Sequence, residues 1–328
     1  MRLTHTQPTI HHHRPVFVIS LSLESGHEGQ GECAPLPGFS HETIETVEKE
    51  LTIAKQVLVD FSETITAPFL TTLSQFHDYV YPFHFSPSVM FGLESALLDA
   101  YSYKFKTPHH LLIHASSPSS VSSNVLLMGS KDEVWQKAST MAKKGMTVFK
   151  LKLGHLEAIE ALQLVASVRD RIGPSSQLRL DINRAWSLNT AQHMIQDLLP
   201  YNISYIEEPL QYPHDLRSLF KKTPIPIALD ETLQQAESIF LQENHIILTM
   251  QNNNSDTCVK LKASNIGAFV LKPTLIGGIS RTIQFANIAK QLGIPVVISS
   301  SYESPIGTSC LSAIASGLSP NDTHGIDV

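Results

Sequence analysis

The chain has 328 residues, of which 42% are hydrophobic and 16% are charged, so it can build a large core and shows no sign of global disorder. Its length exceeds one small domain and suits a barrel of roughly 200–250 residues with an accessory domain. The formal net charge is −6 and no lysine or arginine stripe is present, which argues against a nucleic-acid partner.

The N-terminal residues, the apolar runs and the cysteines further limit the kinds of protein that this chain can be. The N-terminal residues lack the apolar core of a signal peptide, and no later apolar run is long enough to span a bilayer, so we expect a cytoplasmic protein with no membrane partner. Cys33, Cys258 and Cys310 are far apart without CxxC spacing, which predicts reduced cysteines and neither disulfides nor a zinc site. The oligomeric state, monomer or homo-oligomer, stays open.

The first third of the chain predicts a small α+β domain over residues 1–118. Residues 15–23 read as a β-strand that returns as a hairpin through GQGECAP. A Pro/Gly loop over 35–40 leads into helical periodicity over 44–57. A second helix, expected over 87–103, carries small and apolar residues on most faces, as a buried helix should.

Residues 119–328 change character, because short apolar strands recur between helical stretches. The candidate strands are 121–128, 147–152, 178–182, 203–207, 225–230, 268–272 and 295–299. Strand and helix in alternation predict parallel βα units, and this number of units predicts a closed (β/α)7β TIM-type barrel in the α/β class. The gap from Asp230 to Lys272 exceeds the others, and we expect residues 243–263 to form a surface excursion after a helix, away from the active-site face.

Barrel enzymes build their sites where strands end, so charged residues that close apolar strands are the candidates. Lys150 and Lys152 point to the same side of one strand. A lone KxK favours the outward, solvated orientation. If the pair faces inward, mutual repulsion and desolvation lower a lysine pKa toward that of a base. Lys272 closes a strand across the mouth from the pair, where it is either a fixed cation beside the substrate or a lysine reaching to solvent.

Acidic residues close three successive strands, at Asp181, Glu207 and Asp230. Neighbouring strands lie roughly 5 Å apart, so we expect the three carboxylates to converge. Carboxylates completed by water or substrate are the oxygen ligands that Mg²⁺ prefers, with Mn²⁺ as the alternative. The sequence thus predicts a metal site, although each residue alone could also cap the next helix.

The motifs KLKLG, LRLDINRAW, YIEEPL, IALDETL and VLKPTLIGG, in this order, resemble the muconate-lactonizing branch of the enolase superfamily. The segments GECAPLPGFSHET, PSVMFGLESALLDA and VVISSSYESPIG resemble the o-succinylbenzoate synthase family. The resemblance implies a capping domain over the barrel mouth and a small-molecule carboxylate substrate. The implied reaction is the Mg²⁺-dependent dehydration of 2-succinyl-6-hydroxy-2,4-cyclohexadiene-1-carboxylate to 2-succinylbenzoate in menaquinone synthesis.

The resemblance also assigns roles. It implies Lys152 as the general base, Lys150 as its pKa-lowering neighbour, and Lys272 as the opposing lysine that stabilises an enediolate. Asp181, Glu207 and Asp230 would be the metal ligands. Arg179 matches a family position close to the catalytic lysines, and we expect it to bind substrate.

Three features remain as expectations. The serines that close the seventh strand, Ser299, Ser300 and Ser301, could bind a substrate carboxylate through amides and hydroxyls. The resemblance implies that residues 36–40 and the stretch before Pro15 cover the site, while the run His11–His13, which does not resemble the family, is expected to be solvated. The chain stops at HGIDV, so the eighth strand should be short.

Other functions on this scaffold stay open. A dipeptide epimerase would place an acidic pair near the SSSYES segment to hold a substrate ammonium, and that pair is missing. An N-acylamino acid racemase is harder to separate from a synthase. A non-catalytic binding protein of the same fold would be favoured by loss of a lysine or carboxylate of the set, and none is lost.

Overall fold

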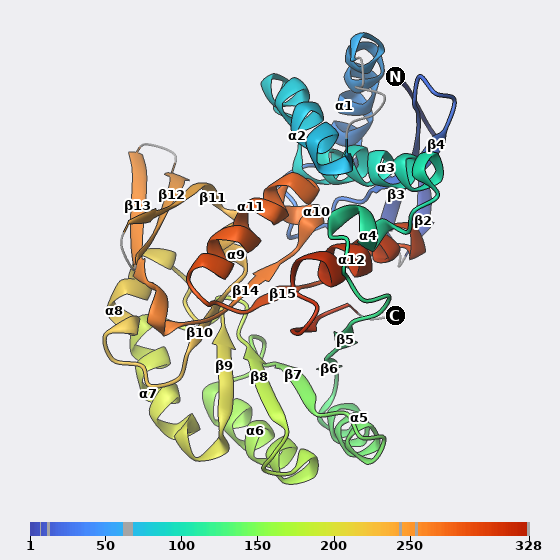
Figure 1. Cartoon of the computed structure of the whole chain (residues 1–328). Helices are drawn as coiled ribbons and strands as arrows, with labels where there is room; N and C mark the ends of the chain where they lie inside the picture. Colours follow the sequence, from blue (N-terminus) through green and yellow to red (C-terminus); the bar gives the residue numbers. More distant parts are fainter. Residues whose placement is uncertain (7, 12–13, 62–67, 243–244, 253–254, 327–328) are drawn as a thin grey trace.

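The computed structural model describes residues 1–328 except 7, 12–13, 62–67, 243–244, 253–254 and 327–328. An N-terminal part of sheet and helices stands against one end of a larger part in which strands and helices alternate (Figure 1). The expected boundary between residues 118 and 119 stays a prediction. His12 and His13 of the histidine run lie outside the described residues.

The N-terminal part is an antiparallel sheet covered by helices. Its strands are β1 (Arg2–His5), β2 (Thr9–His11), β3 (Arg14–Ser22) and β4 (Glu28–Cys33), and β3 pairs with each of the others. Its helices are α1 (Ile44–Val57), α2 (Phe69–Val80), α3 (Pro87–Phe105) and α4 (His109–Ile113). The predicted hairpin is β3–β4, and both predicted helices are present as α1 and α3. Helix α3 is buried on almost all faces, as its composition indicates.

All seven predicted barrel strands are confirmed, and they pair in parallel in chain order. They are β6 (Val125–Leu127), β7 (Val148–Lys152), β8 (Gln177–Asp181), β9 (Ile203–Glu207), β10 (Ile227–Leu229), β14 (Ile266–Leu271) and β15 (Val296–Ile298). The helices are α5 (Lys131–Lys143), α6 (Ala158–Ile172), α7 (Leu188–Leu198), α8 (Leu216–Phe220), α9 (Glu231–Gln234), α10 (Pro273–Ile276), α11 (Gly278–Gln291) and α12 (Pro305–Leu318). The fold is therefore the predicted α/β barrel.

A short eighth strand, β16 (Thr323–His324), joins the two edges of this sheet. It pairs in parallel with β5 (Ser122–Ser123), just before β6. On its other side Gly325 donates its amide to Ile298 of β15 at 2.9 Å and accepts from Ser300 at 2.9 Å. The C-terminal segment thus lies between the first and last barrel strands, and the expectation of a short eighth strand is confirmed.

The long gap before Lys272 holds an antiparallel sheet. Its strands are β11 (Ala236–Gln242), β12 (His245–Asn252) and β13 (Ser255–Lys262), paired in the order β11-β12-β13. A helix precedes this sheet, as expected, but α9 has only four residues, and the sheet begins at Ala236, before the expected start of the excursion at residue 243. The sheet lies beside α8 and α11 on the outer side of the barrel (Figure 1).

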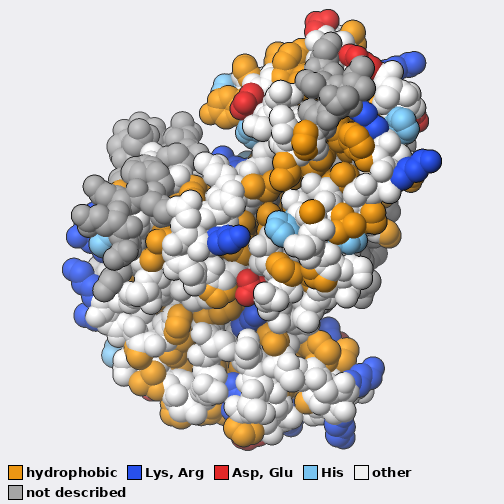
Figure 2. Space-filling view, in the orientation of Figure 1, with side chains coloured by type: hydrophobic (Ala, Val, Ile, Leu, Met, Phe, Trp, Pro, Cys, Tyr) orange, Lys and Arg blue, Asp and Glu red, His pale blue; other side chains and the backbone are white. Residues whose placement is uncertain are grey.

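Three further expectations can be compared with the described residues. Cys33 and Cys310 are buried and free. Over the same residues, no helix combines the length and apolarity required to cross a bilayer. On the face shown in Figure 2, Lys and Arg side chains lie scattered over the edges and the middle and form no continuous stripe.

Candidate active site

Three carboxylates end neighbouring strands of the barrel. Asp181 is the last residue of β8, Glu207 is the last residue of β9, and Asp230 follows β10. These strands are hydrogen-bonded neighbours, and Asp181 pairs in register with Glu207. All three residues are fully buried. Parallel pairing therefore brings to one edge of the sheet three acidic groups that are far apart in the sequence.

Lysines reach these carboxylates from both sides. Lys150 Nζ lies 3.0 Å from Asp181 Oδ2 and 2.6 Å from Glu207 Oε1. Lys152 Nζ is 3.9 Å from Asp181 Oδ2. From the other side Lys272 forms an ion pair with Asp230. The structure thus has the inward orientation of both lysines of the KxK pair, and the outward orientation that KxK alone favours is wrong.

The electrostatics of Lys150 differ from the expectation. Burial lowers the pKa of the Lys150 ammonium, but the charges of Asp181 and Glu207 outweigh burial and raise it well above its ordinary value. The argument from the two lysines alone left out these facing carboxylates, and the role of Lys150 as the neighbour that lowers the pKa of Lys152 stays a prediction. Burial also lowers the pKa of Lys272, but Asp230 and Glu231 raise it above its ordinary value.

Glu207 is the carboxylate of this cluster whose pKa burial raises above its ordinary value. Burial, followed by the charge of Asp181, raises the pKa of Glu207 to about 8 although Lys150 opposes the shift. Glu207 Oε2 accepts no hydrogen bond, and neither does Asp181 Oδ2, which lies near Lys150 without hydrogen-bond geometry. Buried carboxylate oxygens without donors carry negative charge that a cation would neutralise.

This donor set fits a hard divalent cation, which takes carboxylate oxygens as ligands. Gln234 Nε2 donates to Asp230 Oδ1 at 2.6 Å, and the amide of Asn183 donates to Asp181 Oδ1 at 3.2 Å, so neighbouring groups orient two of the three carboxylates. Within the described ranges no three acidic, histidine or cysteine side chains form a ready-made metal cluster, since lysine ammonium groups hold these carboxylates.

A cavity of about 160 Å³ opens at this cluster. Its lining includes Lys150, Lys152, Asp181, Lys272, Ser299, Ser300 and Ser301, together with Leu36, Phe39, Asn124, Leu126, Tyr302 and Gly325. Leu36 and Phe39 come from the predicted covering loop of the N-terminal part. Arg14, directly before Pro15, donates through Nη2 to the carbonyl of Tyr302 at 3.0 Å, so the second predicted covering segment also reaches the site.

Arg179 does not reach the cavity. It lies two residues before Asp181, is buried, and donates through Nη1 to the carbonyl of Thr323 at 2.8 Å. Its guanidinium also lies over the ring of Tyr205, 5.2 Å from the centroid. The structure therefore gives Arg179 a contact with the C-terminal strand, deeper in the barrel than the substrate position that the sequence suggested.

Sequence reasoning missed Asn124 as part of the lining. Asn124 is buried between β5 and β6, and its amide donates to the carbonyl of His324 at 2.8 Å. That contact joins residues from opposite ends of the barrel, so no local pattern in the sequence marks it. Sequence reasoning also gave no role to Glu303, whose carboxylate accepts hydrogen bonds from Ser300 Oγ and from the amide of Ser301. Its position directly after the serine run was a local signal that could have found it.

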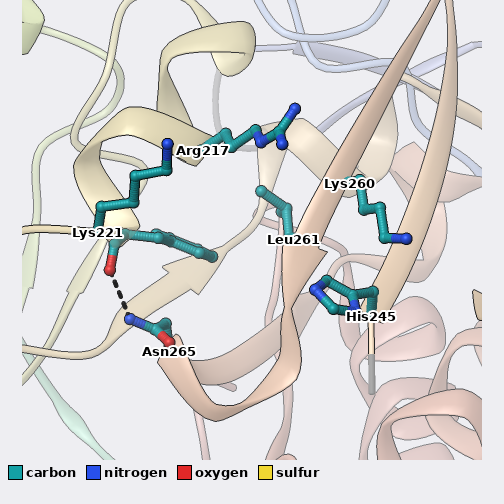
Figure 3. A pocket seen from close by; sticks show the side chains of 7 residues that line it. Arg217, Lys221, His245, Lys260, Leu261 and Asn265 are labelled. Atoms are coloured by element: carbon teal, nitrogen blue, oxygen red, sulfur yellow. Dashed lines mark hydrogen bonds between the residues drawn. The ribbon is translucent and has the colours of Figure 1, made fainter. Parts of the chain in front are cut away.

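A larger cavity of about 610 Å³ lies elsewhere, between α8 and the outer sheet (Figure 3). Its lining residues are Arg217, Phe220, Lys221, His245, Lys260, Leu261 and Asn265. Figure 3 shows Asn265 donating to the carbonyl of Phe220, at 2.7 Å. Among the described residues that line it, this cavity has cations but no carboxylate and shares no residue with the strand-end cluster, so the smaller cavity is the candidate active site. No residue described for β11–β13 is among those that line the pocket at the strand ends.

Comparison with known families agrees with the geometry. A family model described as "Enolase C-terminal domain-like" matches residues 133–242. A second, described as "MenC, N-terminal domain", matches residues 7–100. The chain is 33% identical over 307 residues to an o-succinylbenzoate synthase of Klebsiella pneumoniae, covering 93% of this chain and 80% of the relative. It is 33% identical over 305 residues to an o-succinylbenzoate synthase of Haemophilus influenzae, covering 92% and 78%.

Solved structures share the fold. MenC from Desulfotalea psychrophila matches with a TM-score of 0.77 and 22% identity, covering 100% of this chain and 94% of that one. A dipeptide epimerase from Enterococcus faecalis matches with a TM-score of 0.78 and 19% identity, covering 99% and 88%. Because enzymes of different activity superpose equally well at these identities, the structural likeness bears on the fold alone.

Proposed function

The chain belongs to the o-succinylbenzoate synthase family of the enolase superfamily and has the activity of that family, and we propose that Lys152 is the base of its reaction. The reaction removes water from 2-succinyl-6-hydroxy-2,4-cyclohexadiene-1-carboxylate and gives 2-succinylbenzoate, a step of menaquinone biosynthesis. The observation that carries the proposal is the entry of Lys152 and Lys272 into one pocket from strands on either side of three buried carboxylates.

Lys152 is favoured over Lys150 as the base by its surroundings. Two carboxylates hold the Lys150 ammonium, and its side chain is 9% exposed. The nearest carboxylate oxygen to Lys152 Nζ lies at 3.9 Å, and its side chain is 26% exposed to the pocket. Lys152 can therefore meet a substrate, whereas Lys150 acts as a fixed charge that orients Asp181 and Glu207.

Proton transfer by Lys152 accounts for both bonds that break. The neutral amine takes the proton alpha to the ring carboxylate, and the ammonium so formed donates it to the departing hydroxyl, which leaves as water. The ring becomes aromatic and the amine is regenerated. Lys272, on the opposite side of the pocket, supplies positive charge near the carboxylate on which negative charge builds.

Enzymes of this superfamily use a divalent metal, and magnesium is the ion proposed here. Asp181, Glu207 and Asp230 would hold it. When bound, such an ion supplies positive charge that makes the alpha proton of a carboxylate more acidic.

The deciding experiment follows the loss of the diene's ultraviolet absorbance with and without Mg²⁺. Metal-dependent loss is expected for the wild type, and Lys152→Ala should lower the rate by at least about 10²- to 10⁴-fold, the usual contribution of a positioned base. Lys137→Ala, at an exposed position on α5, is the control and should match the wild type. A wild type that leaves the diene untouched would reject this substrate, and deuterium exchange into N-acylamino acids and dipeptides would then be tested.

An epimerase function is disfavoured by Glu303. An epimerase needs acidic groups free to hold the substrate ammonium near the serine run. The Glu303 carboxylate instead accepts hydrogen bonds from Ser300, Ser301 and Thr274 and is buried.

A further inference from the structure

Asn124 brings a side-chain amide into the candidate active site. It lies between β5 and β6, is 5% exposed, and lines the cavity at the strand ends. Its Oδ1 is buried and has no hydrogen-bond partner, and among the described residues no group bonds to its Nδ2. A buried amide without partners costs free energy, and a ligand that bonds to it removes that cost.

Strand geometry turns this amide toward the inside of the barrel. Side chains two residues apart lie on the same face of a strand, and Leu126, two residues after Asn124, also lines the cavity. Leu126 pairs in register with Lys150 of β7, whose side chain reaches the strand-end carboxylates. Asn124 therefore faces the same interior, one step deeper than Leu126.

The C-terminal segment holds the backbone around Asn124. The backbone amide of Asn124 donates to the carbonyl of His324 at 2.8 Å, and Ser123 Oγ donates to the carbonyl of Ile326 at 2.7 Å. A Cβ on Gly325 would lie 3.7 Å from Asn124 Oδ1 and 2.9 Å from Ser299 Oγ, so the glycine leaves room beside both side chains. An amide that is already held in place loses little entropy when a ligand binds.

The strand order places Asn124 between two groups that the proposed function uses. On one side, β6 pairs with β7, which carries Lys152. On the other side, the C-terminal segment that holds Asn124 forms a bridge from Gly325 to Ser299, the first residue of the serine run. The strands with the three carboxylates follow beyond β7. Asn124 thus lies between the proposed base and the serine run, away from the metal site.

The substrate of the proposed function has one group that suits this position. Its ring carboxylate is required at the metal site, and the serine run is the predicted contact of the carboxylate at the far end of the succinyl chain. The ketone of that chain lies between these two ends. Because a ketone oxygen is an uncharged acceptor, the uncharged amide of an asparagine can donate to it without a countercharge.

We propose that the side-chain amide of Asn124 donates a hydrogen bond to the ketone oxygen of the succinyl chain and so contributes to substrate specificity. The substrate named here rests on the proposed function. The ketone lies outside the bonds that break, so Asn124 should bind it equally in the ground state and in the transition state. Loss of such binding raises KM and leaves kcat unchanged.

The first test uses two ligands that differ only at the ketone. These are 2-succinylbenzoate and 2-(3-carboxypropyl)benzoate, which has a methylene group in place of the ketone. In calorimetric titrations with Mg²⁺ present, the wild type should bind 2-succinylbenzoate about threefold to tenfold more tightly, the usual worth of one hydrogen bond. Asn124→Ala should bind the two within about twofold of each other. Equal binding by the wild type, or a preference that survives in Asn124→Ala, would overturn the assignment.

Steady-state kinetics separate binding from a structural role. Asn124→Ala should raise KM for the diene by about threefold to tenfold and change kcat by less than about twofold. The melting temperature should not fall, because the amide has no partner in the free protein. Asn189→Ala, at an exposed position on α7, is the matched control and should equal the wild type in all three quantities. A raised KM that comes with a lower melting temperature would make Asn124 a structural residue.

A second variant shows whether the polar group or the volume of Asn124 matters. Asn124→Leu nearly keeps the volume of the side chain but has no donor, so it should lose the preference for the ketone as Asn124→Ala does. A ketone preference in Asn124→Leu equal to that of the wild type would mean that the shape of the cavity makes the distinction, and it would overturn the proposal.

The titrations need no turnover, so this proposal and the proposed function can fail separately. A wild type that prefers the ketone through Asn124 but leaves the diene untouched would count against the synthase activity alone. A wild type that consumes the diene but binds both ligands equally would count against Asn124 alone.

Discussion

Glu207 is the carboxylate whose surroundings most oppose its charge. It is fully buried, one of its oxygens has no donor, and Asp181 pairs beside it. If it binds a divalent metal, Glu207→Gln should weaken Mg²⁺ binding by at least about 100-fold, since even neighbours of a ligand are worth about 10- to 100-fold. Calorimetric titration with Mg²⁺ and Mn²⁺ measures this directly.

The matched control for that titration is Glu160→Gln, which removes an equal charge from an exposed position on α6. Its affinity for Mg²⁺ should stay within about twofold of the wild type, because exposed charges are screened over about 10 Å in 0.1 M salt. Equal affinity in Glu207→Gln and the wild type would remove Glu207 from the metal site.

The sequence predicts well which charged residues gather at the strand ends, but it predicts poorly which groups their side chains contact. Lys152, Asp181 and Lys272 could be found because each closes an apolar strand, and strand geometry then brings them to one edge. The ion pairs of Lys150 could not be found, because they depend on side-chain positions from two further strands. The depth of Arg179 in the barrel was missed for the same reason.

Strand β4 and helix α3 approach so closely at Gly31 that a side chain there would meet the helix backbone. A Cβ on Gly31 would lie 2.0 Å from the carbonyl oxygen of Gly92 and 2.8 Å from the amide nitrogen of Ala96. Gly31→Ala should therefore lower the free energy of unfolding by about 2–3 kcal/mol, the usual cost of overpacking a rigid contact. Urea unfolding with an unchanged slope would measure it.

The adjacent, exposed Gln30 provides the control, since Gln30→Ala should change stability by no more than about 0.5 kcal/mol. A Gly31→Ala variant as stable as Gln30→Ala would mean that α3 can move away from β4 without loss. The sequence predicted both elements, but it could not predict their contact, because no local pattern relates Gly31 to Gly92.

Helices and strands whose apolar residues recur at regular spacing were predicted nearly to the residue. The three strands β11–β13, which lack such spacing, were not predicted. Helix α1 and strand β9 begin and end where the apolar spacing does. After β10 the chain forms the four-residue helix α9 and then the three strands β11–β13, where a βα unit would place one longer helix. Their residues alternate weakly, and pairing of neighbouring strands rather than local preference decides their structure. The expected excursion over residues 243–263 includes positions outside the described residues.

Over the whole molecule, the last described residues hold the first and last barrel strands together. His324 is fully buried; its Nδ1 accepts from the amide of Ile298 at 3.0 Å and its Nε2 donates to the carbonyl of Ser319 at 3.1 Å. Only the neutral ring can accept at Nδ1. Arg179 reaches the same segment through Thr323. An uncharged histidine thus adds two hydrogen bonds to the backbone contacts that close the barrel.

This dependence predicts how stability changes with pH. Burial, aided by the charge of Arg179, lowers the pKa of His324 to about 4, against about 6.5 in the unfolded chain. The unfolded state therefore binds the proton more readily, so the contribution of His324 is complete above pH 6.5 and is lost as pH falls toward 4, by up to about 3 kcal/mol. His324→Gln keeps an acceptor and a donor but does not titrate. Urea unfolding from pH 7 to 4 should show the wild type losing about 3 kcal/mol more than His324→Gln, and parallel losses would mean that protonation of His324 does not open the barrel.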